Sequence, residues 1–211
     1  NCMRPHLSMS RRTSRTPFSS RVEAAGATGY TVYNHTLLAT SFRGIEVDYW
    51  HLCENVQVWD VSCEKQVTLM GPGANQLAQY MTPRDLSNAQ VGRCYYLPMC
   101  DENGSMISDG VGIKINDRHW RLSVADSDVL LWAKGLAVGF GLDVEVREPE
   151  IFPLAVQGPK AEALMCRVFG DAIKELGFFA IAPFVYKGKR MKVARSGWSK
   201  QTGFEVFVND A

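Results

Sequence analysis

Apolar and polar residues alternate along many short stretches of the chain, and glycine, proline and asparagine separate these stretches. Residues 56–61 alternate with a period of two, which is the pattern of a half-buried strand. The same pattern, bounded by turn residues, predicts further strands at 66–70, 93–99, 106–115, 120–124, 142–146, 152–156, 178–185, 190–195 and 204–208.

Three other stretches have the apolar spacing of helices. In 74–81, Leu77 and Met81 share one face, and Pro83 follows the stretch. Asp126 is the predicted N-cap of a helix over 127–139, and a third helix is predicted over 160–169. Strands and helices are mixed without strict βαβ alternation, so the pattern predicts an α+β fold and not a doubly wound sheet.

Composition and net charge limit the kinds of molecule that this protein is expected to bind. The chain has 211 residues, of which 46% are hydrophobic and 21% charged, which is typical of a globular protein with a full core. Its net charge of +1 predicts no nucleic-acid partner, and no apolar run reaches the roughly 18 residues of a membrane span. The six cysteines form no C-x-x-C pair, so we expect no metal site and reduced thiols in a cytoplasmic protein.

One segment near the C-terminal end, residues 194–205, combines several unusual features. Within twelve residues it contains Arg195, Trp198, Glu205 and two glycines, which allow a backbone to approach a ligand closely. An aromatic face and a carboxylate together suit a planar heterocycle that carries an amino group and a ring N–H. The alternative is a β-hairpin with a bulge, and this segment alone does not distinguish the two.

The same segment resembles the R-[ST]-G-Y-T-G-E-x-G-[FY]-E signature of the glycine cleavage T-protein family of folate-dependent enzymes. Trp198 replaces the tyrosine of the signature, residues 199–201 differ from it, and Glu205 is kept. The strings WDVS at 59–62, TPRD at 82–85, GSMISD at 104–109 and AVQGPKA at 155–161 match other family blocks in order. The resemblance implies that Glu205 holds the pterin ring of tetrahydrofolate. It also places Arg195, Ser123 and Asp126 on the cofactor side of the channel.

The family resemblance implies a multi-domain fold of antiparallel sheets with packed helices. Residues 1–60 and 150–211 would form a discontinuous first domain, and 61–149 an inserted second domain. A C-terminal barrel-like third domain follows in the family, and we expect it to be absent from this chain. The first 22 residues contain five arginines and no acid, so they resemble either a transit peptide or a basic arm. Because the family-like strings begin at Arg11, we favour a mature segment.

Longer strings, at 11–18, 30–35, 48–52, 93–96, 125–128 and 195–201, resemble a demethylase branch of this family. That branch moves a methyl group from a small sulfonium compound to N5 of tetrahydrofolate. The T-protein uses the first aspartate of its G-G-x-[IL]-D-D block beside the reacting nitrogen, and Ser108 stands at this position here, followed by Asp109. A sulfonium methyl has a neutral leaving group and needs no carboxylate for an iminium-like species, so this departure favours the demethylase.

The resemblance therefore yields a set of candidate residues. Ser108, Asp109 and Tyr96 are the catalytic candidates. The candidates for the substrate site are four aromatic side chains, whose faces attract a sulfonium, and a lysine for its carboxylate: Trp198, Tyr95, Trp50, Tyr33 and Lys200. An aminomethyltransferase, another folate-dependent O- or S-demethylase and a non-catalytic folate-binding module remain as alternatives, and a homodimer is compatible with each.

Overall fold

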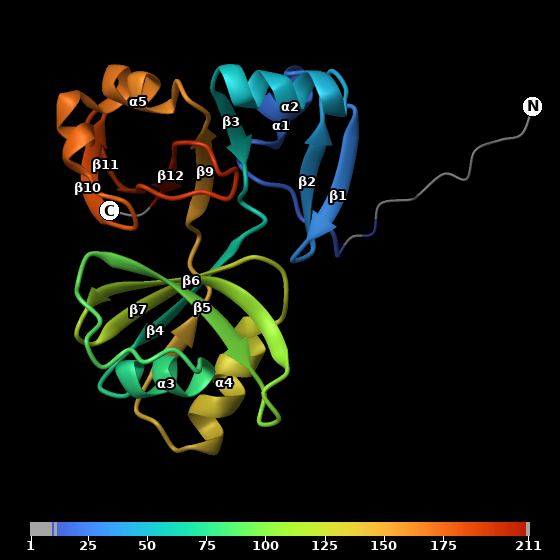
Figure 1. Ribbon diagram of the computed structural model, residues 1–211. Helices are drawn as coiled ribbons and strands as arrows, with labels where there is room; N and C mark the ends of the chain where they lie inside the picture. Colours follow the sequence, from blue (N-terminus) through green and yellow to red (C-terminus); the bar gives the residue numbers. More distant parts are fainter. Residues whose placement is uncertain (1–9, 11, 210–211) are drawn as a thin grey trace, which may run out of the picture.

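The computed structural model describes residues 10 and 12–209, so residues 1–9 and 11 of the proposed basic arm lie outside the described residues. Two five-stranded antiparallel sheets form its centre, one above the other in Figure 1. The first sheet has the order β10-β11-β12-β9-β3, and the second has the order β5-β6-β7-β4-β8. This arrangement confirms the predicted α+β class.

The first sheet is built from two separate parts of the chain, one before and one after the strands of the second sheet. Its strands are β3 (Gln57–Asp60), β9 (Phe152–Gln157), β10 (Ile181–Tyr186), β11 (Lys189–Ala194) and β12 (Gly203–Val208). Helix α5 (Ala161–Phe169) and the 3₁₀ helix η1 (Asp171–Glu175) cover its outer face. Buried Phe204, Val206 and Met165 join the helix to the strands, which removes their apolar surface from water.

The second sheet lies between two helices and the first sheet. Its strands are β4 (Lys65–Met70), β5 (Arg93–Cys100), β6 (Met106–Asn116), β7 (His119–Val124) and β8 (Glu145–Arg147). Helices α3 (Ala74–Met81) and α4 (Val129–Gly139) cover its outer face, where Leu77, Trp120 and Leu122 are fully buried. The chain leaves the first sheet after Asp60 and re-enters it at Phe152, near the predicted domain boundaries.

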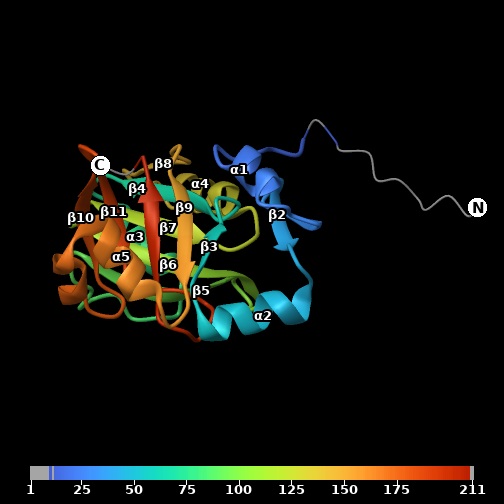
Figure 2. The same ribbon diagram turned by 90° about the horizontal axis from the view of Figure 1, so that it is seen from above.

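The N-terminal part was not predicted as secondary structure. It contains α1 (Ser19–Ala24), a hairpin of β1 (Gly29–Tyr33) and β2 (Thr36–Ser41), and α2 (Ile45–Glu54). Figure 2 shows α1 and the hairpin beside β3, the edge strand of the first sheet. The hairpin turns at Asn34 and His35, both with positive φ. Asn34 Nδ2 donates to the carbonyls of Cys63 (2.9 Å) and Ala125 (3.0 Å), which attaches the turn to the second sheet.

Three local predictions were wrong. Asp126 is not an N-cap, because α4 begins at Val129 and Asp126 Oδ1 instead accepts a hydrogen bond from the backbone N–H of Asn34 at 2.8 Å. The predicted strand over 142–146 begins only at Glu145, because the preceding backbone closes the end of α4. The predicted strand over 178–185 begins at Ile181, because Phe179 has a φ of 56°, which no strand residue adopts.

Candidate functional site

The inner faces of the two sheets meet, and the strand register shows which side chains lie there. Residues directly opposite in an antiparallel pair share a face. Phe207 and Ala194 of the first sheet pack against Cys94 and Ile113 of the second in one buried cluster, so these residues mark the two inner faces. Glu205 lies opposite Ala194 and two residues before Phe207, so its side chain also faces the second sheet.

Glu205 is a carboxyl group held inside the protein. It is only 8% exposed, and it accepts a hydrogen bond from Ser196 Oγ. Burial raises the pKa of Glu205, while the hydrogen bond from Ser196 and the positive charge of Arg121 act in the opposite direction. Arg121 is itself buried on the inner face of β7, with its guanidinium carbon 4.4 Å from the centre of the Phe207 ring. Glu205 is therefore a buried acceptor that points toward the inner face of the second sheet.

A second carboxyl group lies near Glu205 and was not predicted. Glu64 is in the turn between β3 and β4, where the chain crosses from one sheet to the other. Burial, followed by repulsion from Glu205, raises the pKa of Glu64 to about 8. Two carboxyl groups in a poorly solvated space do not both ionise readily. With a pKa of about 8, Glu64 holds a proton at neutral pH and adds no negative charge beside Glu205.

Replacing Glu64 with glutamine is expected to make the protein more stable in mildly alkaline solution. The folded protein holds a proton on Glu64 between its unfolded pKa near 4.5 and about 8, so the free energy of unfolding falls as pH rises through this window. Glu64→Gln removes this dependence and raises the free energy of unfolding at pH 8.5 by roughly 2 kcal/mol. Urea denaturation of both proteins at pH 5, 6.5 and 8.5 measures this difference in the free energy of unfolding. The exposed Glu54→Gln is the control, and parallel pH profiles for wild type and Glu64→Gln would contradict the assignment.

Three predicted site residues come together at the rim of the inner face. Tyr96 on β5 donates from its hydroxyl to Asp109 Oδ2 on β6 at 3.0 Å, and this bond raises the pKa of Tyr96. The ring of Trp198 meets the Tyr96 ring edge-on, with 6.3 Å between centroids, and Trp198 is 63% exposed. Two aromatic rings beside a carboxylate form a surface that attracts a small organic cation.

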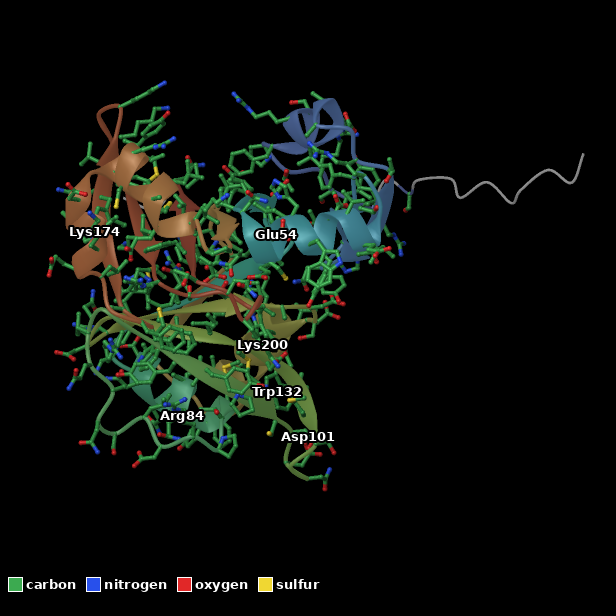
Figure 3. The ribbon with its side chains drawn as sticks, turned by 45° about the horizontal axis from the view of Figure 1, so that its top comes forward. Glu54, Arg84, Asp101, Trp132, Lys174 and Lys200 are labelled. Atoms are coloured by element: carbon green, nitrogen blue, oxygen red, sulfur yellow. The ribbon has the colours of Figure 1, made fainter. Side chains whose placement is uncertain are left out.

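The loop that carries Trp198 joins β11 to β12, and we call residues 195–202 the β11–β12 loop. The side chain of Gln157 enters it: Nε2 donates to the carbonyl oxygens of Ser196 (3.1 Å) and Phe204 (3.5 Å), and Oε1 accepts from Ser199 Oγ at 2.6 Å. Lys200 is exposed in this loop, and Figure 3 places it at the level where the two sheets meet. The twelve-residue segment is therefore a loop and the start of a strand, built around a buried amide.

Two glycines of this segment make room for Gln157. A Cβ at Gly197 would lie 2.1 Å from Gln157 Nε2, and a Cβ at Gly203 would lie at the same distance from this atom. Gly197 has in addition a φ of 152°, in the region that favours glycine. The glycines therefore serve close approach of a side chain from β9 to the loop backbone.

Other predicted residues lie on the outer faces. Ser108 is paired with Met99, and Tyr95 packs against the helix-covered cluster with its ring 6.0 Å from that of Trp120. Both therefore point away from Asp109 and Tyr96, because neighbouring strand residues face opposite sides. Arg195 also points outward, where its Nη2 donates to Glu162 Oε2 at 2.8 Å.

The remaining candidates lie in two places. Ser123 is on the inner face, where its hydroxyl accepts from Gln66 Nε2 at 2.8 Å. Trp50, on α2, is exposed and meets Tyr49 edge-on at 5.2 Å, and Tyr33 is an exposed residue at the end of β1. Within the described residues, no hydrogen bond, ion pair or ring contact joins Trp50, Tyr33 or Asp126 to the cluster of Tyr96, Asp109 and Trp198, which we call the Tyr96 cluster.

The two buried thiols, Cys63 and Cys94, are in surroundings that disfavour the reactive thiolate form. Burial is the main factor that raises the pKa of Cys63 and of Cys94, each to about 12, so both remain protonated near neutral pH. No group of His, Cys, Asp and Glu side chains suited to a metal ion occurs in the part of the chain that the structure describes. Among the described helices, none has the length and apolar character needed to cross a membrane.

Comparisons with known proteins agree with this architecture. The family described as "GCVT N-terminal domain" matches residues 18–211. Dimethylsulfoniopropionate demethylase DmdA of Ruegeria pomeroyi is 51% identical over 199 residues, which cover 94% of this chain and 55% of that protein. An aminomethyltransferase of Alcanivorax borkumensis is 32% identical, over 80% of this chain and 47% of its own length. The chain thus spans about half the length of these relatives.

A solved structure has the same fold. The crystal structure of glycine cleavage system aminomethyltransferase T from Bartonella henselae superimposes with a TM-score of 0.77 at 23% identity. The match covers 92% of this chain and 53% of that one. It agrees with the T-protein-like arrangement of antiparallel sheets and packed helices that the sequence motifs implied.

Proposed function

The chain belongs to the GCVT N-terminal domain family, and on that premise we propose that it is part of a tetrahydrofolate-dependent demethylase. The enzyme takes a methyl group from dimethylsulfoniopropionate and transfers it to N5 of tetrahydrofolate, giving 5-methyltetrahydrofolate and methylmercaptopropionate. The observation that carries the proposal is the cluster of Tyr96, Asp109 and Trp198, which lies on the same inner side of the two sheets as Glu205. The 51% identity to a dimethylsulfoniopropionate demethylase supports the choice of donor.

Glu205 is the proposed anchor of the folate. Its carboxyl group is buried, is oriented by the hydrogen bond from Ser196, and lies near Glu64, which is uncharged at neutral pH. A carboxylate accepts two N–H groups side by side, which matches the ring N–H and amino group of a pterin. Tetrahydrofolate supplies a nucleophilic nitrogen, N5, for the methyl group.

Trp198, Tyr96 and Asp109 are the proposed site for the sulfonium. Each aromatic face contributes roughly 0.5–2 kcal/mol to binding a cation, depending on how well water is excluded. Asp109 adds a negative charge whose position is fixed by the hydrogen bond from Tyr96. Lys200, in the same loop as Trp198, is the proposed partner of the substrate carboxylate. Ser108 and Tyr95 are left out, because they lie on the outer face of the second sheet.

Catalysis then depends mainly on alignment. The N5 lone pair forms the new bond to the methyl carbon as the C–S bond breaks, and the sulfide leaves neutral, so no side chain has to donate a proton to it. The methylated N5 then releases its proton to water, which gives 5-methyltetrahydrofolate. Holding nucleophile, methyl carbon and sulfur in line contributes several kcal/mol, up to about 7–11 in well-oriented intramolecular reactions. Glu205 and Trp198 from the first sheet, with Tyr96 and Asp109 from the second, set that line. We place the reaction in the cytoplasm, in keeping with the free cysteines of the described residues.

A single-turnover assay with the full-length polypeptide tests the proposal. The enzyme is mixed with tetrahydrofolate and with dimethylsulfoniopropionate that carries deuterated S-methyl groups, and the folates are analysed by mass spectrometry. We expect 5-methyltetrahydrofolate with three deuterium atoms. Unlabelled folate alone would overturn the demethylase assignment, and ammonia release from an aminomethyl-loaded lipoyl protein would instead support the aminomethyltransferase. Folate affinity without turnover on either donor would support a binding module.

A further inference from the structure

Gln157 is a buried polar side chain that hydrogen bonds the segment on both sides of Trp198. Its side chain has no exposed surface, although an amide is costly to bury unless it is hydrogen bonded. It lies opposite Gly203 in the sheet, two residues along β9 from the row of Glu205, and therefore on the inner face. From this place it makes its hydrogen bonds to Ser196, Ser199 and Phe204, which bracket Trp198 from both sides.

Other hydrogen bonds hold the two ends of the β11–β12 loop: Ser196 Oγ donates to Glu205, and the backbone N–H of Gly158 donates to the carbonyl of Thr202 at 2.9 Å. The middle of the loop depends on Ser199 and its bond to Gln157. Its backbone includes Gly197 with a φ of 152° and Lys200 with a φ of 58°, conformations that a free loop has no reason to keep. Ser199 Oγ, which donates to Gln157, also accepts from the backbone N–H of Gln201 at 3.1 Å. The Gln157 amide is therefore bonded to Ser196 before Trp198 and, through Ser199, linked to Gln201 after it. Trp198 is largely exposed and cannot fix the loop by packing.

We propose that Gln157 is a positioning residue for the methyl donor: its amide holds the β11–β12 loop so that Trp198 faces Tyr96. The inference rests on the proposed function, because it assigns the Trp198–Tyr96 pair to the sulfonium. Glu205 depends less on Gln157, since β12 fixes it by pairing with Ala155 and Ala194. Gln157 bonds the Ser196 carbonyl, whereas the Ser196 hydroxyl bonds Glu205. Loss of the amide therefore weakens donor binding more than folate binding.

Gln157→Met tests the proposal, because methionine has a similar length and no amide. In the full-length protein we expect the KM for dimethylsulfoniopropionate to rise at least tenfold, while the Kd for tetrahydrofolate changes less than threefold. Ser199→Ala removes one of the three hydrogen bonds and keeps Gln157, so it remains informative if Gln157→Met fails to fold, and it is expected to raise the same KM about threefold. Exposed Gln90→Met is the matched control and leaves both constants unchanged.

A second readout does not depend on activity. Lys200 is an exposed trypsin site within the loop, and an ordered loop is cleaved slowly. We expect cleavage after Lys200, followed by mass spectrometry, to be at least tenfold faster in Gln157→Met and several-fold faster in Ser199→Ala, with other sites unchanged. If wild type transfers no methyl group, the proposed function fails while this readout still decides whether Gln157 holds the loop. Wild-type cleavage rates in both variants, or equal losses of donor and folate affinity, would overturn the positioning role.

Discussion

Glu205→Gln is expected to weaken tetrahydrofolate binding about 100-fold, which corresponds to about 2.7 kcal/mol. The substitution keeps the size of the side chain but replaces one acceptor oxygen with a donor, so it no longer matches two N–H groups. Because burial raises the pKa of Glu205, a neutral side chain is tolerated by the fold, and the free energy of unfolding should stay the same or increase. Fluorescence or calorimetric titration with tetrahydrofolate measures the loss.

Two further variants make this result specific. Ser196→Ala removes the hydrogen bond that orients Glu205 and is expected to weaken folate binding about tenfold. Glu162→Gln changes an acid on the outer side of the same sheet, where it pairs with Arg195, and should leave folate affinity within twofold. Unchanged affinity in Glu205→Gln would refute the anchoring role, whatever the effect on turnover.

Gly203→Ala is expected to lower the free energy of unfolding by roughly 2–3 kcal/mol. The three nearest atoms to an added Cβ all belong to the Gln157 side chain, at 2.1 to 2.4 Å. Gln157 would have to leave its buried position and give up its hydrogen bonds to Ser196, Ser199 and Phe204. Urea denaturation of the variant and the wild type measures the change.

A double variant isolates the cause of this destabilisation. In Gln157→Ala the space that the Cβ needs is vacant, so adding Gly203→Ala should cost less than 0.5 kcal/mol beyond Gln157→Ala alone. Gly197→Ala provides the contrast, because its φ of 152° strains any side chain and the cost should persist in the Gln157→Ala background. Additive costs for Gly203→Ala and Gln157→Ala would show that the two residues do not interact.

Sequence periodicity located most of the strands because their apolar residues face defined buried clusters. Stretch 93–99 illustrates this: Leu97 and Met99 are buried under the helices, while Tyr96 faces the first sheet. The hairpin of β1 and β2 was missed because its strands are half-exposed and carry no strict alternation. Its position depends on Asn34, whose contacts with residues about 90 positions away leave no local signal.

The candidate site was only partly predictable, because it too depends on contacts between residues that are far apart in the sequence. Motif strings identified Glu205, Trp198 and Asp109, but a string does not tell which face of a strand each residue occupies. Tyr95 and Tyr96 are adjacent in sequence, yet they point to opposite sides of the second sheet. Glu64 and Gln157 were missed, although Gln157 lies in the AVQGP string, because burial and a partner from another strand define their roles.

A structure of the full-length protein with bound tetrahydrofolate and dimethylsulfoniopropionate, or an unreactive analogue of the donor, tests the central claim most directly. The account predicts that the pterin amino group and ring N–H donate to Glu205, and that the sulfonium lies against Tyr96 and Trp198 with Asp109 nearby. A pterin bound elsewhere, with the Glu205 carboxylate making no contact with it, would contradict the account.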